Sequence, residues 1–130
     1  MFNKIIGDSH LELEFAAFLE NCDDIISYAK NYLAVGFKLD YVDSNGDISN
    51  YFPDFLVKKG DKQVFIVETK GREDLDVPLK MERLKQWCSD VNSQQSDVIY
   101  DFVYVDQESF EKYSPNNFAE LIANFRAYKD

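Results

Sequence analysis

The sequence predicts a mixed α/β domain (α+β) in which a four-stranded mixed sheet is flanked by helices on both faces. Three observations support this fold class. Apolar residues recur at helical spacing near both ends of the chain and again after residue 76. Between these segments lie short runs that alternate or are continuously apolar, separated by turn residues, as is typical of strands. One predicted helix stands between two predicted strands, an order that favours a parallel pair.

Length and composition favour one globular domain over residues 1–130. Hydrophobic residues make up 45% of the chain and aromatic residues 15%, enough to build a core. No apolar run approaches the roughly 20 residues that span a bilayer, and the N-terminus lacks a signal-peptide pattern. We therefore expect a soluble, cytoplasmic protein without a membrane partner. Cys22 and Cys88 have no paired spacing and are expected to be core thiols in a reducing compartment.

The first elements are expected to be helices. Ser9 followed by Glu12 has the form of a capping box, and the apolar spacing that follows predicts a helix over residues 9–21. Asp23 can cap a second, short helix that ends near residue 31. The apolar contacts of this second helix would come from Ile25, Ile26 and Ala29.

Three consecutive antiparallel strands are expected next. Residues 35–42 alternate as a strand does, residues 44–47 have the composition of a tight turn, and residues 48–58 are the hairpin partner. Because proline cannot donate a ladder hydrogen bond, Pro53 predicts an edge, a bulge or a strand start within that partner. Residues 63–69 then form a near-continuous apolar strand of the kind that is buried on both faces.

The remaining elements alternate between helix and strand. Asp76 and Pro78 begin a helix that is expected over residues 77–93. Residues 98–105 form the fourth strand, parallel to its neighbour in the sheet. A final amphipathic helix starts near residues 114–115. Its inward-facing side chains would be Phe118, Leu121, Ile122 and Phe125.

A net charge of −10 argues against strong binding to nucleic acid by itself, because lysine and arginine supply most of the affinity for phosphate. The charge is unevenly distributed. Residues 1–57 carry three bases and ten acids, residues 58–85 carry eight and six, and residues 86–130 carry three and eight. The one net-positive segment holds most of the candidate site. Tight binding to DNA would therefore need a partner or a neighbouring domain.

Two carboxylates and one lysine fall on neighbouring predicted strands. Asp54 lies within the second strand, and Glu68 and Lys70 lie at the end of the third. Because side chains alternate along a strand, Glu68 and Lys70 leave the same face, whereas Thr69 points away and its carbonyl stays near. Each carboxylate lies among apolar neighbours, where a charge needs a partner. A divalent cation is the most economical partner.

This arrangement suits the hydrolysis of a phosphodiester. The reaction requires a hard cation to polarise the phosphoryl oxygen and activate water, and additional positive charge for the transition state. Oxygen ligands favour Mg²⁺, with Mn²⁺ as a substitute, so Asp54, Glu68 and the Thr69 carbonyl are the predicted ligands. Lys70 would orient the water or stabilise developing charge. A cross-strand salt bridge between Glu68 and Lys70 is the alternative, which the apolar strand and the following Gly71 disfavour.

These residues resemble the PD-(D/E)xK nuclease superfamily. The likeness is greatest to the endonuclease domain at the C-terminal end of type III restriction enzyme nuclease-helicase subunits and related helicases. It covers roughly residues 9–92. The matching features are Ser9-x-x-Glu12-x-x-Phe15-Ala16, Tyr51-x-Pro53-Asp54, Val67-Glu68-Thr69-Lys70-Gly71 and Asp76-x-x-x-Lys80 leading into Trp87.

The resemblance implies a restriction-endonuclease-like core, Mg²⁺-dependent cleavage of DNA, and a helicase or translocase as a fused or associated partner. It also implies that Asp54 and Glu68 ligate the metal and that Lys70 assists the water. An acid of the first helix would join the outer shell of the metal, and Glu12 is the candidate, with Glu14 as its competitor. The capping-box role explains Glu12 equally well.

Substrate contacts are less sharply predicted. Arg72, Lys80 and Arg83 are candidates to contact phosphate, although a solvated helix face explains them equally well. Trp87 has the spacing of a core residue rather than of a platform for bases. No Walker motif or helicase element is present, so the chain is expected to be an excised domain or a stand-alone relative.

Other functions are weighed against this one. The single histidine, His10, argues against nucleases and hydrolases that use an imidazole in the reaction centre. The competing function from another class is a catalytically silent module that keeps the fold and docks a helicase or another partner. The complete Asp-Glu-Lys set weighs against that module, and the acidic composition weighs for it. Stabilisation by Mg²⁺ would separate the two.

Overall fold

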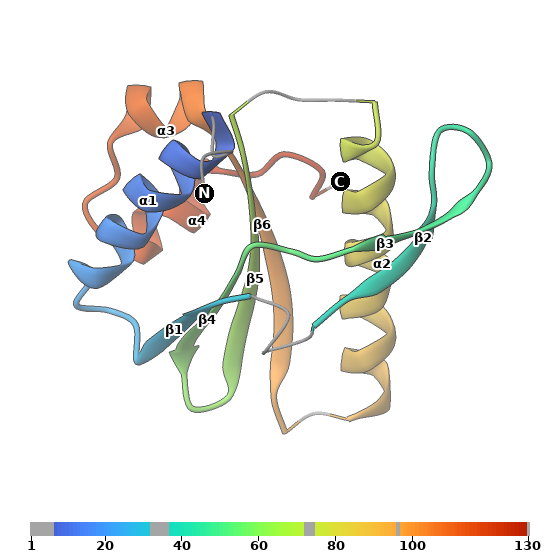
Figure 1. Ribbon diagram of the computed structural model, residues 1–130. Helices are drawn as coiled ribbons and strands as arrows, with labels where there is room; N and C mark the ends of the chain where they lie inside the picture. The colour runs from blue at the N-terminus through green and yellow to red at the C-terminus, as the bar shows by residue number, and fades with distance from the viewer. Residues whose placement is uncertain (1–6, 32–36, 72–74, 96, 130) are drawn as a thin grey trace.

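The computed structural model describes residues 7–31, 37–71, 75–95 and 97–129. In this part of the chain, a four-stranded mixed sheet has the strand order β1-β4-β5-β6 (Figure 1). The first two pairs in this order are antiparallel and β5 pairs parallel with β6. The predicted mixed α/β architecture is therefore confirmed. The strands are β1 (Ser27–Lys30), β4 (Phe55–Gly60), β5 (Gln63–Lys70) and β6 (Ile99–Asp106).

Helices cover both faces of this sheet (Figure 1). Helices α1 (Gly7–Glu20), α3 (Gln107–Tyr113) and α4 (Phe118–Asn124) lie on one side. Helix α2 (Val77–Gln94) lies on the other side, together with a hairpin. The hairpin is a separate two-stranded sheet of β2 (Leu39–Val42) and β3 (Ile48–Tyr51).

The sheet separates two apolar clusters, because successive side chains of a strand point to opposite faces. On β5, Phe65 and Val67 belong to the cluster under α1 and α4. Ile66, between them, belongs to the cluster under α2. All three side chains are at most 3% exposed, as the apolar run predicts for a strand covered on both faces. The predicted core role of Trp87 is confirmed, since its ring packs between Phe37 and Tyr100.

The predicted second helix, from Asp23 to about residue 31, is wrong. Residues 27–30 form β1, an edge strand that pairs antiparallel with β4. The pairing aligns Tyr28 with Val57 and satisfies backbone groups that a single exposed helical turn would leave to water. Asp24, the residue after the predicted cap Asp23, serves another helix, because its carboxylate accepts the N–H groups of Phe118 and Ala119 at the start of α4.

The strand predicted over residues 48–58 is two strands. β3 ends at Tyr51 and β4 begins at Phe55, with Pro53 in the break between them. The predicted hairpin of β2 with β3 is confirmed, but it belongs to the separate sheet. The three consecutive antiparallel strands therefore do not share one sheet, and β1 takes the edge position beside β4. The start of the predicted strand, residues 35–36, lies outside the described residues.

Several element ends also differ from the predictions. Helix α1 begins at Gly7, which is earlier than predicted. The predicted capping box of Ser9 with Glu12 involves a side chain outside the described ones. The final helix begins at Phe118 with Asn117 as its N-cap, later than predicted. The short helix α3 was not predicted, and Asp106 caps it by accepting the Ser109 N–H. The predictions for β5, α2 and β6 hold to within a residue at each end.

Two further expectations concern burial and hydropathy. Cys22 and Cys88 are buried free thiols, as the sequence predicts. Burial raises the pKa of Cys22 to about 11 and that of Cys88 to about 12. Of the helices described, none combines the length and the apolar character that crossing a bilayer would require.

Candidate active site

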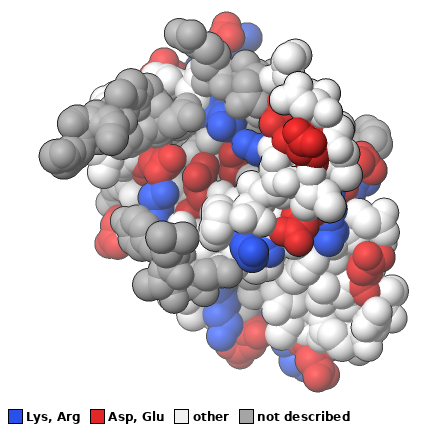
Figure 2. All heavy atoms as spheres, turned by 45° about the vertical axis from the view of Figure 1, so that its right-hand side comes forward, with Lys and Arg blue, Asp and Glu red and all other residues white. Residues whose placement is uncertain are grey.

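A pocket of about 260 Å³ lies where β5 ends and where β3 leads into β4. It brings together residues that are far apart in the sequence and come from three layers of the fold. Figure 2 shows acidic and basic side chains side by side around a hollow of this face. The pocket is lined by Glu12 of α1, Asp54 before β4, Glu68, Thr69 and Lys70 of β5, Lys80 of α2, and Asn50, Tyr51 and Phe52.

The backbone around Pro53 holds Asp54 in the pocket, just before β4 begins. The Asp54 N–H donates to the Val67 carbonyl at 3.1 Å, and its own carbonyl accepts the Asn31 N–H at 2.8 Å. The buried Asn31 side chain also donates to the Pro53 carbonyl at 2.8 Å. The break that proline imposes on the strand is thus tied down by specific hydrogen bonds. Asp54 occupies a defined position beside β5 as a result.

The Asp54 carboxylate is held by Thr69. The Thr69 N–H donates to Asp54 Oδ2 at 2.9 Å, and the Thr69 hydroxyl donates to the same oxygen at 2.8 Å. Oδ1 accepts no hydrogen bond from the described residues. Burial, and next the nearby Glu12 carboxylate, raise the pKa of Asp54 to about 6, although the two bonds from Thr69 oppose the rise. A half-buried carboxylate with one oxygen engaged is suited to bind a cation with the other.

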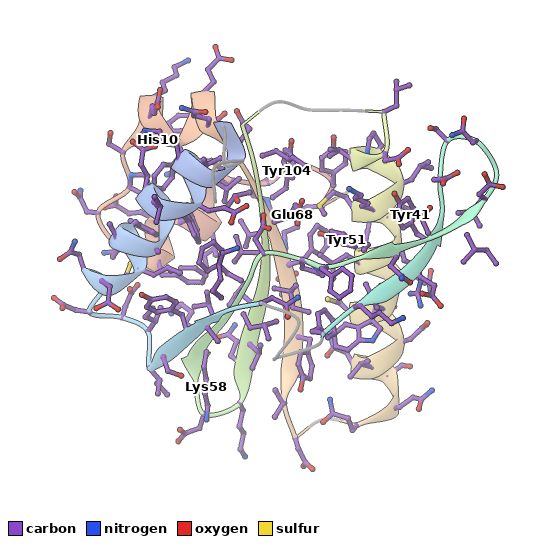
Figure 3. All side chains as sticks on the ribbon, in the orientation of Figure 1. His10, Tyr41, Tyr51, Lys58, Glu68 and Tyr104 are labelled. Carbon is purple, nitrogen blue, oxygen red and sulfur yellow. The ribbon has the colours of Figure 1, made fainter. Side chains whose placement is uncertain are left out.

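Glu68 is the more deeply buried acid, at 4% exposure. The Tyr51 hydroxyl donates to Glu68 Oε1 at 3.0 Å, and Figure 3 shows the two side chains on the α2 side of the sheet. Burial raises the pKa of Glu68 well above its usual value, and the neighbouring Asp54 charge adds to this. Lys70, Tyr51 and Lys80 favour the ionised form but do not outweigh burial. Glu68 and Asp54 therefore oppose each other's ionisation.

The pair has the chemistry of a hard-cation site. A buried carboxylate and a half-buried one that disfavour each other's charge would be neutralised by a divalent ion, and oxygen ligands select Mg²⁺ or Mn²⁺ over softer metals. Across the described ranges, which omit residues 72–74, no three Asp, Glu, His or Cys side chains surround one point closely enough to hold an ion. Backbone oxygen and water would have to complete the coordination. Mg²⁺ tolerates this, because it usually keeps several waters.

Two lysines supply positive charge to the pocket. Lys70 lines it from the end of β5, two residues after Glu68 and on the same face. Lys80 reaches it from α2, with its Nζ 5.6 Å from the ring centre of Tyr51 and 5.9 Å from that of Tyr41. Such cation–π contacts fix the direction of a flexible side chain. The predicted convergence of Asp54, Glu68 and Lys70 is found, and Lys80 joins it.

The first-helix acid in the pocket is Glu12. It forms an ion pair of 2.5 Å with Lys30 of β1, and it lies close enough to Asp54 to raise the pKa of that carboxyl. Glu14 lines a different pocket, between α1 and α3, and lies 3.5 Å from His10. The structure thus places Glu12, and not its competitor, at the candidate site.

The structure does not place the other two candidates for phosphate contact, Arg72 and Arg83, in the pocket. Arg72 lies outside the described residues. Arg83 is not among the residues that line the pocket, and its Nε donates to the Asp40 carbonyl of the hairpin at 3.0 Å.

Sequence reasoning assigned no role to Tyr51, Asn31 or the Thr69 side chain. Tyr51 was only part of a matching motif, and the predicted short helix was expected to end near Asn31. Neither the contact of Tyr51 with Glu68 nor that of Thr69 with Asp54 leaves a periodic signal, because each joins segments that are distant in the sequence. One signal was available for Thr69: a hydroxyl-bearing residue between Glu68 and Lys70 interrupts an apolar strand.

A mixed sheet with helices on both faces and a carboxylate-lysine pocket at a strand end is consistent with a nuclease of the restriction-endonuclease-like class. The comparison with protein families agrees with this class. Residues 1–108 match the endonuclease domain family, and the chain therefore belongs to that family. Comparisons with curated proteins and with solved structures gave no match.

Proposed function

We propose that this domain is a Mg²⁺-dependent endodeoxyribonuclease of the PD-(D/E)xK type, similar to the nuclease domain of type III restriction enzymes. The observation on which the proposal rests is the single pocket that gathers Asp54, Glu68 and Lys70 from separate parts of the chain. Membership of the endonuclease domain family supports the same conclusion from a different direction.

Asp54, Glu68 and the Thr69 carbonyl are the proposed ligands of Mg²⁺, for which Mn²⁺ would substitute. When bound, the ion polarises the phosphoryl oxygen and lowers the pKa of a coordinated water. The hydrogen bonds from Thr69 to Asp54 and from Tyr51 to Glu68 each engage one carboxylate oxygen and fix its orientation. Such outer partners determine how well a ligand holds its metal.

The other residues have distinct proposed roles. Lys70 orients the attacking water or stabilises charge that develops on the phosphate in the transition state. Glu12 acts in the outer shell of the site, and its bond to Lys30 keeps it directed at the pocket. Lys80, with Arg72, contacts the phosphate backbone of DNA, which positions the strand without reading its sequence.

The proposal includes a partner and a cellular location. A chain with a net charge of −10 gains little affinity from the phosphate backbone, so we propose that a helicase or translocase, fused or associated, delivers the DNA. We place the protein in the cytoplasm, which suits its two buried free thiols.

The alternative function is a silent docking module with the same fold. The acidic composition favours it, since such a chain would more readily bind a basic protein surface than DNA. The buried carboxylates disfavour it, because a module without a cation would keep two acids that oppose each other for no structural gain.

A plasmid-nicking assay at low salt tests the proposal. The wild-type protein is expected to nick supercoiled plasmid with Mn²⁺ and more slowly with Mg²⁺. Asp54→Ala and Lys70→Ala should each lose at least about a hundredfold in rate, as is usual when a group acting at the reaction centre is removed. The matched controls are Asp61→Ala in an exposed turn and Lys58→Ala at the far end of β4, labelled in Figure 3. Both controls should retain full activity.

Thermal unfolding in parallel separates the two functions. Mn²⁺ should raise the midpoint of unfolding for the wild type and for both controls, because an ion that binds only the folded site stabilises the folded state. It should not raise the midpoint for Asp54→Ala, which lacks a proposed ligand. Equal residual nicking in the wild type, Asp54→Ala and Lys70→Ala would identify a contaminant. If the midpoint also failed to respond to Mn²⁺, the docking module would be the better description.

A further inference from the structure

A second pocket, of about 410 Å³, lies at the carboxyl ends of β5 and β6. It adjoins the candidate active site, because Lys70 lines both pockets. Its volume lies within the range of about 300–1,000 Å³ that is usual for sites that bind small molecules. A chemical group bound in this pocket would therefore lie beside a phosphate held at Lys70.

One wall of this pocket is aromatic. It is formed by Tyr104 near the end of β6 and by Tyr128, which follows α4, with ring centres 5.3 Å apart and planes at 86°. Figure 1 shows the segment after α4 crossing the strand ends toward the α2 side, and Figure 3 shows Tyr104 on that side with Glu68. Tyr128 has a positive φ of 67°, which a bulky residue keeps only where its surroundings hold it.

The rest of the pocket lining carries hydrogen-bond acceptors. It contains the carboxylates of Asp106 and Glu108, with Gln107 between them. Two carboxylates repel a phosphate but accept hydrogen bonds from amino groups. Flat aromatic side chains stack on nucleobases of any kind. A nucleobase that carries an exocyclic amino group matches both the tyrosines and the acceptors, whereas the sugar-phosphate backbone matches neither.

We propose that this pocket binds one unstacked nucleobase, that of the nucleotide next to the phosphate held at Lys70. This inference rests on the proposed nuclease function and specifies its substrate. A base inside a duplex cannot enter a pocket while its own phosphate lies beside the catalytic carboxylates, so the base has to leave the stack. An unpaired base leaves at the lowest cost. The domain therefore favours unpaired adenine, cytosine or guanine over unpaired thymine, which lacks the amino group.

Binding measured without cleavage tests this pocket. The probes are fluorescein-labelled duplexes that contain one unpaired adenine, one unpaired thymine, or no unpaired base, and anisotropy is followed in EDTA at low salt. The wild-type chain should bind the adenine probe at least about fivefold more tightly than the paired probe, the lower range expected for one stacked base. The thymine probe should lie between them. Tyr128→Ala should abolish the difference between adenine and paired probes, and Tyr128→Phe should keep it.

Controls distinguish failure of this pocket from failure of the nuclease. Tyr113→Ala removes an exposed tyrosine of α3 that is not among the residues lining either pocket, and it should keep the adenine preference. Equal binding of the adenine and paired probes by the wild type would overturn the nucleobase site. An adenine preference that survives Tyr128→Ala would also overturn it. The base would then bind elsewhere on the domain, and the pocket would be free to contact a partner protein. Mn²⁺-dependent nicking of fully paired plasmid tests the nuclease separately.

Discussion

Each carboxylate of the site depends on one neighbouring hydroxyl. Thr69 holds Asp54, and Tyr51 holds Glu68, which is buried to 4% exposure. A hydrogen bond to an ionised, buried group contributes about 1.5–3 kcal/mol. The free energy of these bonds stabilises the charged form that a metal needs, against the burial that disfavours it.

The first prediction at this scale concerns Tyr51. Tyr51→Phe keeps the ring against Lys80 and removes the hydrogen bond to Glu68. We expect the Mn²⁺ concentration for half-maximal nicking to rise about tenfold to a hundredfold, as for other outer partners of metal ligands. Tyr41→Phe is the control, because its hydroxyl bonds to Asp76 at 2.8 Å, whereas the hydroxyl that bonds to Glu68 is that of Tyr51. An unchanged Mn²⁺ requirement in Tyr51→Phe would show that the hydroxyl has no role in the site.

The second prediction concerns the free energy of unfolding when no metal ion is bound to the acid pair. Asp54→Asn keeps the shape of the side chain and removes the negative charge of a carboxyl group whose pKa is raised to about 6. The free energy of unfolding in EDTA at neutral pH should rise by about 1–3 kcal/mol, the range that a shift of this size allows. Urea unfolding measures this change, with Asp61→Asn as the exposed control. A loss of stability would mean that the Asp54 charge is already compensated within the protein.

At the scale of elements, sequence patterns predicted the long segments well. The apolar run that became β5 and the capped amphipathic segment that became α2 were predicted nearly to the residue. They succeed because burial on a whole face leaves a periodic record. The failures were short: β1 has four residues, and α3 has seven. β1 is a strand because β4 lies beside it, which no local pattern records.

Asp24 illustrates how distant segments fix an element. Its carboxylate accepts the N–H groups of Phe118 and Ala119 at 3.0 and 2.9 Å and so caps α4 from the far end of the sequence. Partial burial raises the pKa of Asp24, but these two amides, with smaller contributions, hold it below its ordinary value. The carboxylate is therefore more acidic in the folded protein than in the unfolded chain.

The third prediction follows from the sign of this shift. Because the folded pKa of Asp24 is lowered, its stabilisation is complete above the unfolded pKa of about 3.9 and is lost as pH falls through the folded value. Asp24→Ala should reduce the free energy of unfolding at pH 7 by about 0.5–2 kcal/mol, the usual cost of a lost N-cap. The difference from the wild type should shrink below pH 4. A loss in Asp23→Ala as large as in Asp24→Ala would contradict this assignment.

For the whole molecule, the acidic net charge disfavours binding of the proposed substrate. The chain carries a net charge of −10, yet the proposed substrate is a polyanion. The fold partly offsets this repulsion, because Lys70 and Lys80 line the same pocket as Asp54 and Glu68. In the chain as a whole, 24 acidic residues outnumber 14 basic ones, so the surface potential opposes further contacts with phosphate. Affinity for DNA should therefore come from a small number of contacts and from a partner.

The fourth prediction is a shallow dependence of DNA binding on salt. If Lys70, Lys80 and Arg72 are the phosphate contacts, the slope of the logarithm of the binding constant against that of salt should be about −3. Lys80→Ala should make it shallower by about one. Anisotropy titrations of a short duplex at several salt concentrations measure both values. A slope far steeper than this would reveal a basic surface that the described residues do not explain.

The fold class, the longest elements and the candidate site residues could be predicted from the amino-acid sequence alone. Asp54, Glu68 and Lys70 stood out because charged residues in apolar strands are costly and two-residue spacing fixes a shared face. Other features became visible only in three dimensions: Glu12 rather than Glu14 lines the pocket, and β1 borders β4. The hydrogen bonds by which Thr69, Tyr51 and Asn31 hold the two acids and the Pro53 backbone are also of this kind. Periodicity records which face of an element is buried, whereas partners are chosen by the pairing of segments that are distant in the chain.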